Sequence, residues 1–287
     1  MPIRHTAPPG PNCATSMDEL DAIEPAFAFR ERGRPAAVVA RSSRLSPGRR
    51  RGVAVFGACA ACLGLLLAPA LSLRLRADHR SGVAQVETVT LADGSLVQLA
   101  PLSAIAVDYG AGRRDVRLLK GEAFFSVVPD RAHPFRVIGE RATVTVFGTA
   151  FDVREAPGAG QSTEVSVAHG RVGVASRTGK AALLVAGQGA AVDRVGDLHH
   201  LALPATQVAA WRERHLIVQD EPVSQAIDRL RPWFGGMIVT RGDALDRQRL
   251  TGVFNAADPV GALRGMARAY GGRITVIGDW LVVYSQD

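Results

Sequence analysis

Histidines and paired carboxylates are the residues of this chain whose chemistry could support metal binding or acid–base catalysis. None of the seven histidines follows the HExxH spacing of a zinc protease. Neighbours on a strand point to opposite faces, so we interpret His199-His200 as a solvated turn rather than a metal site. Asp220-Glu221 precedes a predicted helix, whose positive end it is expected to stabilise. With neither a GxSxG nor a P-loop motif, the sequence predicts a protein without catalytic residues, metal or cofactor.

Charge is distributed unevenly along the 287 residues, whose formal net charge is +7. Residues 1–51 carry nine arginines and five acids, residues 52–73 carry no charge, and residues 74–287 carry 25 basic and 22 acidic residues. In the last part both signs are interspersed, without aromatic residues between the basic ones, which disfavours a nucleic-acid partner. The composition, 47% hydrophobic and 21% charged, excludes a chain that is disordered throughout.

The uncharged stretch 52–73 predicts a single transmembrane helix. Its 22 residues would span about 33 Å as a helix, close to the hydrocarbon thickness of a bilayer. A buried soluble helix would show a polar stripe, which is missing here. Ala68-Pro69-Ala70 resembles a signal-peptide cleavage site, but 51 residues make an unusually long preceding region. We therefore expect a membrane anchor, and a buried soluble helix and a cleaved signal peptide are the alternatives.

The flanks of this stretch predict its orientation. Five arginines lie between residues 41 and 51, whereas three follow between residues 74 and 80 together with Asp78. The positive-inside rule then places residues 1–51 in the cytoplasm and residues 74–287 on the far side of the membrane. The exported part has no cysteine, because Cys13, Cys59 and Cys62 all precede it. Residues 1–51 contain seven prolines and are expected to form a largely disordered arm.

Residues 80–200 show the period and turn residues of an all-β domain. Glu87 to Leu91 and Leu96 to Leu99 flank Asp93-Gly94, a strong hairpin signal. The segments Asp115 to Leu119 and Glu122 to Val128 around Lys120-Gly121, and Thr163 to Val167 and Arg171 to Val174 around His169-Gly170, repeat this arrangement. Arg141 to Val146 alternates apolar and polar residues, as a half-buried strand requires. Both a two-sheet sandwich and a wound β-solenoid fit this pattern.

Residues 210–287 change to a mixed period with an internal duplication. Val223, Ala226, Ile227 and Leu230 form one apolar helical face, and a second helix begins at Asp258-Pro259, with Asp as the N-cap. The second helix aligns Val260, Leu263, Ala267 and Tyr270, and the two helices lie 37 residues apart. Short strands flank each helix: Leu216 to Val218, Met237 to Thr240, Leu250 to Phe254 and Arg273 to Ile277, with Trp280 to Tyr284 closing the module. The pattern predicts a duplicated βαβ module.

Three ordered motifs, within residues 121–137, 146–153 and 165–174, closely resemble the FecR family of transmembrane sigma-factor regulators. Leu250-Thr-Gly252-Val-Phe254 before the second helix is similar to the secretin/TonB short N-terminal module. The motif residues that carry the FecR resemblance are Gly121, Phe125, Pro134, Phe135, Gly148, Thr149, Phe151 and Gly170.

The resemblance implies an anti-sigma factor, or sigma-factor regulator, in the bacterial inner membrane, with a periplasmic C-terminal region. Its implied partners are a cytoplasmic extracytoplasmic-function sigma factor and the signalling domain of a TonB-dependent outer-membrane receptor, often one for ferric siderophores. The family's cytoplasmic domain is a longer helical unit with Trp-containing motifs, whereas residues 1–51 contain no Trp. We therefore expect a truncated or misassigned N-terminus, a degenerate regulator, or an arm that folds on binding.

The duplicated module is the expected contact region for the receptor, through an edge strand or a helix face, with β-augmentation as the binding mode. Phe234, Phe254, Tyr270 and Trp280 are the candidate anchors, although most aromatic residues in such positions belong to a core. The alternative is an envelope structural protein that binds peptidoglycan or a secretin-like assembly and has no sigma factor. A glycan-active enzyme would need a carboxylate pair about 5 to 10 Å apart in a cleft.

Overall fold

A computed structural model describes residues 73–156, 162–242 and 244–286. All of them belong to one compact unit, Gly57–Asp287. Apart from Leu73, the predicted membrane span lies outside the described residues, as does the arm 1–51. Within the described ranges, no helix has both the length and the apolar character needed to cross a membrane.

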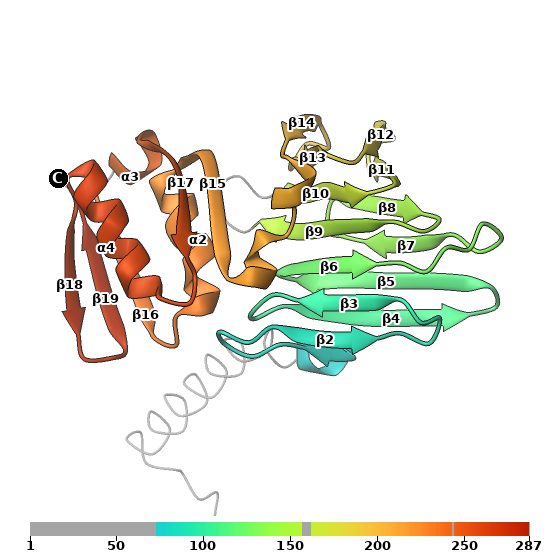
Figure 1. The fold of residues 1–287 in the computed structure, drawn as a ribbon, viewed down its shortest axis with the longest axis horizontal. Coiled ribbons are helices and arrows are strands. Elements are labelled where there is room, and N and C mark those ends of the chain that lie inside the picture. The colour runs from blue at the N-terminus through green and yellow to red at the C-terminus, as the bar shows by residue number, and fades with distance from the viewer. Residues whose placement is uncertain (1–72, 157–161, 243, 287) are drawn as a thin grey trace, which may run out of the picture. The chain divides into compact units, whose positions relative to one another are not determined.

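Two seven-stranded sheets form the first part of the unit, which ends at Ala202 (Figure 1). One sheet contains, in spatial order, β1 His79–Arg80, β4 Ala104–Gly110, β5 Arg113–Lys120, β7 Phe135–Ile138, β8 Ala142–Val146, β11 Arg171–Ser176 and β12 Ala181–Val185. The other contains β14 Leu198–Ala202, β13 Gln188–Val192, β10 Ser162–His169, β9 Ala150–Ala156, β6 Glu122–Ser126, β3 Leu96–Leu99 and β2 Glu87–Thr90.

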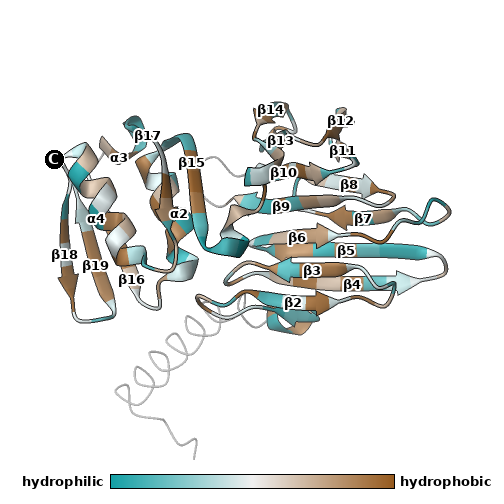
Figure 2. Ribbon diagram, in the orientation of Figure 1, coloured by the Kyte–Doolittle hydropathy of each residue, from teal (hydrophilic) through white to brown (hydrophobic). Residues whose placement is uncertain are grey.

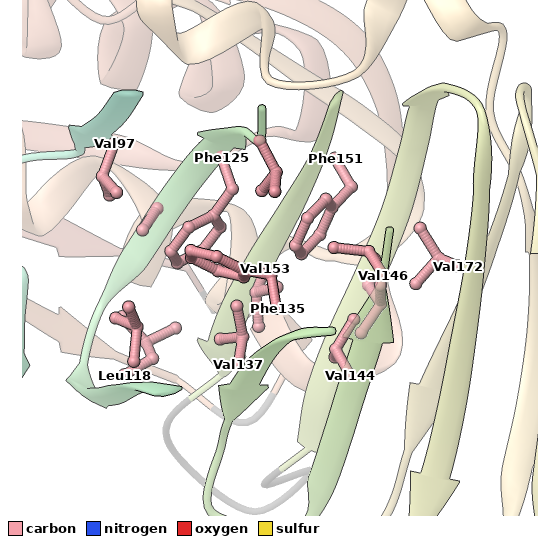
Figure 3. Close-up of a cluster of buried hydrophobic side chains, with 14 of the residues drawn as sticks. Val97, Leu118, Phe125, Phe135, Val137, Val144, Val146, Phe151, Val153 and Val172 are labelled. Carbon is pink, nitrogen blue, oxygen red and sulfur yellow. The ribbon is translucent and has the colours of Figure 1, made fainter. Parts of the chain in front are cut away.

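The two sheets share one apolar core and therefore form a sandwich, one of the two architectures left open by the sequence. Phe125 and Phe151 from one sheet and Phe135 from the other are fully buried. The rings of Phe125 and Phe151 stack with their centroids 5.2 Å apart, and Phe135 meets Phe125 edge-on at 6.1 Å. Figure 3 shows these rings converging with valines of both sheets.

Alternation along the strands accounts for this core. Ala142, Val144 and Val146 of β8 are buried, whereas Thr143 and Thr145 between them are partly exposed, as the sequence predicted. The hairpin at Asp93-Gly94 is also confirmed, because β2 pairs antiparallel with β3.

At Lys120-Gly121 and His169-Gly170 the expectation of hairpins is wrong. β5 and β6 belong to different sheets, and so do β10 and β11, so the chain crosses the sandwich at both places. Gly121 and Gly170 have φ values of +86° and +87°, which favour glycine. A Cβ atom on Gly121 would lie 2.8 Å from the Cα atom of Ser103, so the crossing also needs the missing side chain.

A C-terminal α+β module follows a linker that contains two short 3-10 helices, η1 Ala205–Gln207 and η2 Ala210–Glu213. The module consists of β15 His215–Pro222, α2 Val223–Leu230, η3 Arg231–Trp233, β16 Met237–Arg241, α3 Ala244–Arg247, β17 Arg249–Asn255, α4 Pro259–Tyr270, β18 Arg273–Ile277 and β19 Leu281–Ser285. The predicted apolar face of α2 is fully buried, and Asp258 caps α4 by accepting a hydrogen bond from the Gly261 amide at 2.8 Å.

The duplication is present, but its strands pair differently from those of a βαβ unit. β15 pairs with β17, its counterpart in the second copy, whereas β16 and β18 both flank β19 in a separate three-stranded sheet. The two strands of each copy therefore lie in different sheets. Because α2 and α4 share one buried cluster with strands of both sheets, this pairing gives the apolar faces of both copies a common core.

Candidate interaction site

The linker fastens the module to the outer face of the sandwich sheet that contains β6 and β9. Trp211 of η2 is 4% exposed, and its indole Nε1 donates a hydrogen bond to Asp152 Oδ1 of β9 at 3.0 Å. The guanidinium of Arg212 lies 4.1 Å from the ring centroid of Phe124 on β6, within cation–π range. Phe124 belongs to the same buried cluster as the module core, so apolar contact continues across the junction.

Asp152 keeps its proton more readily than an ordinary aspartate. Burial raises the pKa of this carboxyl group well above its usual value, and the neighbouring charge of Glu122 raises it further. The hydrogen bond from Trp211 acts in the opposite direction but is outweighed. A protonated Asp152 can accept from Trp211 and donate to Glu122, so it satisfies both neighbours at once.

Two ion pairs line a cavity of about 520 Å³ at this junction. On the sandwich, Arg154 Nη2 lies 2.6 Å from Glu164 Oε2, and on the module Arg229 Nη1 lies 2.7 Å from Glu221 Oε1. Burial alone would raise the pKa of Glu164, but Arg154 and then Arg229 lower it below its usual value. The carboxylate of Glu164 therefore stays charged, and it interacts electrostatically with one arginine of the sandwich and one of the module.

The segment directly after the predicted membrane span also contacts the module. The Ala84 amide donates a hydrogen bond to the Pro232 carbonyl of η3 at 3.0 Å, and Val86 packs against the module core. Residues 148 positions apart in the chain therefore meet, and the start of the sandwich is tied to the C-terminal module.

The four predicted anchor residues fall into two groups. Phe234, Phe254 and Tyr270 are partly buried and pack against the module core. Trp280, in the turn between β18 and β19, is 59% exposed. Of the four, Trp280 is therefore the exposed aromatic side chain, whereas the other three lie at the periphery of the module core.

The FecR motif residues lie in the core and in the turns of the sandwich. Phe125, Phe135 and Phe151 form the aromatic centre described above, and Thr149, before β9, is 6% exposed. The remaining motif residues lie between strands: Gly121, Pro134, Gly148 and Gly170. Their positions explain the motif by packing and chain direction rather than by direct contact with a partner.

The capping role predicted for Asp220 and Glu221 is wrong. Both belong to β15, and α2 has no side-chain cap. Asp220 Oδ1 accepts from Arg249 Nε at 2.8 Å, and Glu221 pairs with Arg229. The strand runs to Pro222 with a register shift between Val218 and Glu221, so the carboxylates face neighbouring arginines instead of the helix end.

His199 and His200 lie in strand β14 rather than in a turn, and both are exposed. His199 Nε2 lies 2.9 Å from Asp193 Oδ2, whereas His200 lines the junction cavity. Within residues 73–156, 162–242 and 244–286, no group of three or more His, Cys, Asp or Glu side chains is placed to hold a metal ion.

Asp152, Glu122 and Arg154, which line the junction, were not singled out from the sequence. Ala150, Asp152 and Arg154 alternate with the buried Phe151 and Val153 along β9, and this pattern predicts an outward face. The pattern gives no sign that Trp211, 59 positions further along the chain, covers that face. The contact between Asp152 and Trp211 is a tertiary contact, for which the sequence around either residue gives no signal.

The fold is that of a β-sandwich joined to an α+β module. Residues 77–173 match the family described as FecR protein. These residues of the chain therefore form a FecR domain.

Two crystal structures of a candidate anti-sigma factor from Parabacteroides distasonis ATCC 8503 share the fold. They are 23% and 24% identical to this chain, with TM-scores of 0.65 and 0.66. Each comparison covers 73% of this chain and 98% of the other. None of the curated proteins compared with the chain matches it.

Proposed function

We propose that this protein is an inner-membrane regulator that relays a periplasmic signal from a TonB-dependent outer-membrane receptor to an extracytoplasmic-function sigma factor. It acts by binding, and its siderophore-type signal reaches it through the receptor. The observation that carries the proposal is the FecR domain at residues 77–173, in a fold shared with a candidate anti-sigma factor along nearly all of that protein.

The structure supports a relay through the way its parts are joined. The FecR domain and the C-terminal module share a buried junction, and Ala84, eleven residues beyond the uncharged stretch, is hydrogen-bonded to the module. A partner that displaces the module therefore acts on the segment nearest to the predicted membrane anchor. Because Trp211 and Arg212 fasten the linker to the sandwich, such a displacement must first break their contacts.

Topology is the first test of the proposal. Alkaline phosphatase fused after residue 287 is expected to be active, and green fluorescent protein fused at the same point is expected to stay dark, because residues 74–287 would lie in the periplasm. A fusion before Met1 should give the opposite result. A fluorescent C-terminal fusion with inactive phosphatase contradicts the proposal.

Transcription is the second test. Deleting the reading frame is expected to change expression from promoters that depend on an extracytoplasmic-function sigma factor, including that of a receptor gene. Restoring the full chain should reverse the change, whereas a chain that lacks residues 210–287 should no longer respond to the receptor's ligand. A deletion that weakens the envelope and leaves every such promoter unchanged favours a structural protein instead.

A further inference from the structure

The three-stranded sheet of the module has one covered face and one uncovered face. Ile238, Val282 and Tyr284 point inward and are buried in the cluster that contains α2 and α4. Strand alternation directs the residues between them to the opposite side. We call this side the bare sheet face and define it by Met237, Val239, Thr275, Ile277, Leu281 and Val283.

The register of the sheet arranges these residues in rows. Met237 pairs with Leu281, which pairs with Ile277, and Val239 pairs with Val283, which pairs with Thr275. Two neighbouring rows therefore place five apolar side chains on one face, and Figure 2 shows the corresponding hydrophobic colouring on β18 and β19.

Exposure identifies this face as an interaction surface. Met237 is 55% exposed, Ile277 46% and Val239 39%, and Trp280 in the adjoining turn is 59% exposed. Contiguous exposed apolar residues on a soluble domain mark sites for a partner, whereas single ones need no explanation. Domains normally bury the apolar face of a sheet under a second layer of helices or strands. The structure shows no such layer over the bare sheet face among the described residues.

Charge indicates the chemistry of the partner. The third row of the face is Arg241, Ser285 and Arg273, in which both arginines are exposed and form no ion pair within the described residues. In the rest of the module, three acidic residues are already paired with arginines: Asp220 with Arg249, Glu221 with Arg229, and Asp228 with Arg231. The free charge in the third row is therefore positive, whereas the exposed Asp279 adds a negative charge in the turn next to Trp280, at the opposite end of the face.

The free edge of β16 is less suited to strand addition, because Arg231 Nη1 already donates to the Ile238 carbonyl. We propose that the bare sheet face docks an apolar, acid-bordered protein surface laid across β16, β19 and β18, with Trp280 as an anchor at one end of the face and Arg241 and Arg273 meeting the acidic border at the other. The inference rests on the proposed function, in which this partner is the signalling domain of the outer-membrane receptor. In this inference the partner packs on a face of the sheet, whereas the sequence favoured strand addition at an edge.

The test uses the full chain in detergent micelles, titrated calorimetrically with purified signalling domains of the TonB-dependent receptors encoded in the same genome. Trp280→Ala is expected to weaken binding at least about tenfold, as for a large aromatic anchor that a partner buries. Arg273→Glu is expected to weaken it and to reduce its salt dependence, because attraction to the acidic border becomes repulsion. Leu183→Ala and Arg171→Glu make matched changes at exposed positions of the sandwich and should leave binding unchanged.

Each other outcome overturns the inference in a distinguishable way. If a receptor domain binds and both module variants bind as well as the wild type, the bare sheet face is not the docking site, although the proposed function stands. If no domain binds the wild type, the receptor relay fails together with the inference. Binding to phosphatidylglycerol vesicles, or concentration-dependent dimerisation, that is lost in Trp280→Ala would assign the face to a lipid surface or to a second copy.

Discussion

Replacing Asp152 by asparagine tests whether burial raises the pKa of the carboxyl group at the junction. Asparagine keeps the shape of the protonated acid: its Oδ1 can accept from Trp211 Nε1, now 3.0 Å from Asp152 Oδ1, and its Nδ2 can donate to Glu122. Asparagine does not ionise. We therefore expect Asp152→Asn to fold with nearly unchanged stability at acidic pH and to be the more stable protein as the pH rises.

Proton linkage determines whether the stabilising contribution of Asp152 grows or declines with pH. An unfolded aspartate has a pKa of about 3.9, whereas burial and Glu122 raise the pKa of Asp152 well above that value in the folded chain. The folded state therefore binds this proton more tightly than the unfolded state does. The stabilising contribution of Asp152 is complete below about pH 4 and is lost as the pH rises towards the raised pKa.

The alanine variant, Asp152→Ala, shows how much stability the hydrogen bond from Trp211 contributes. It leaves the buried Trp211 N–H without its acceptor, which costs about 1 to 3 kcal/mol. For a unit of this size, that loss lowers the Tm by roughly 3 to 9 °C. The alanine variant should show this loss across the pH range, since the missing acceptor does not depend on protonation.

The assay is thermal unfolding of the full chain in detergent, followed by circular dichroism between pH 4 and pH 9. The expected result is a wild-type Tm that falls relative to Asp152→Asn as the pH rises, with Asp152→Ala below the asparagine variant at every pH. An asparagine variant as unstable as the alanine variant, or one with the same pH profile as the wild type, would show that Asp152 does not have a raised pKa in the folded chain.

Three further predictions concern the sandwich. Burial raises the pKa of Glu155 to about 7, so stability should decline between about pH 4.3 and pH 7 in the wild type but less in Glu155→Gln, as measured by Tm against pH. Phe125→Ala removes a fully buried ring and should cost about 3 to 5 kcal/mol in urea unfolding, whereas Val128→Ala at a 41% exposed position should cost less than about 1 kcal/mol. Gly121→Ala should lower the Tm by several degrees, because φ is +86° and the new Cβ would lie 2.8 Å from the Cα atom of Ser103; an unchanged Tm would contradict that geometry.

Local patterns predicted the elements of the fold but not all of its connections. The period-2 alternation of Arg141 to Val146 and the apolar spacing of α2 fixed which side chains are buried, because each depends on residues within one element. The crossings at Gly121 and Gly170 look like hairpin turns in the sequence, since glycine permits positive φ in both cases. Which sheet the next strand joins depends on contacts made across the sandwich.

In the candidate interaction site, too, some features follow from local sequence and others from tertiary contacts. Trp280 was predicted as a possible anchor by its residue type, and its exposure is a property of the folded module. The mistaken cap at Asp220-Glu221 arose because an acidic pair before a helix has a local interpretation, whereas Arg229 and Arg249 reach it through tertiary contacts. Asp152 carried no local signal at all, since its environment is created by Trp211 from the linker.

Local sequence patterns were sufficient to predict the all-β character of residues 80–200, the duplicated helices of the module and the motifs of a FecR domain, because period, turn residues and motif order are encoded locally. The pairing of the duplicated strands, the buried carboxyl group at the junction and the bare sheet face became visible only in the folded chain. These features depend on which distant surfaces come into contact, and the free energy of burying one surface against another belongs to neither segment alone.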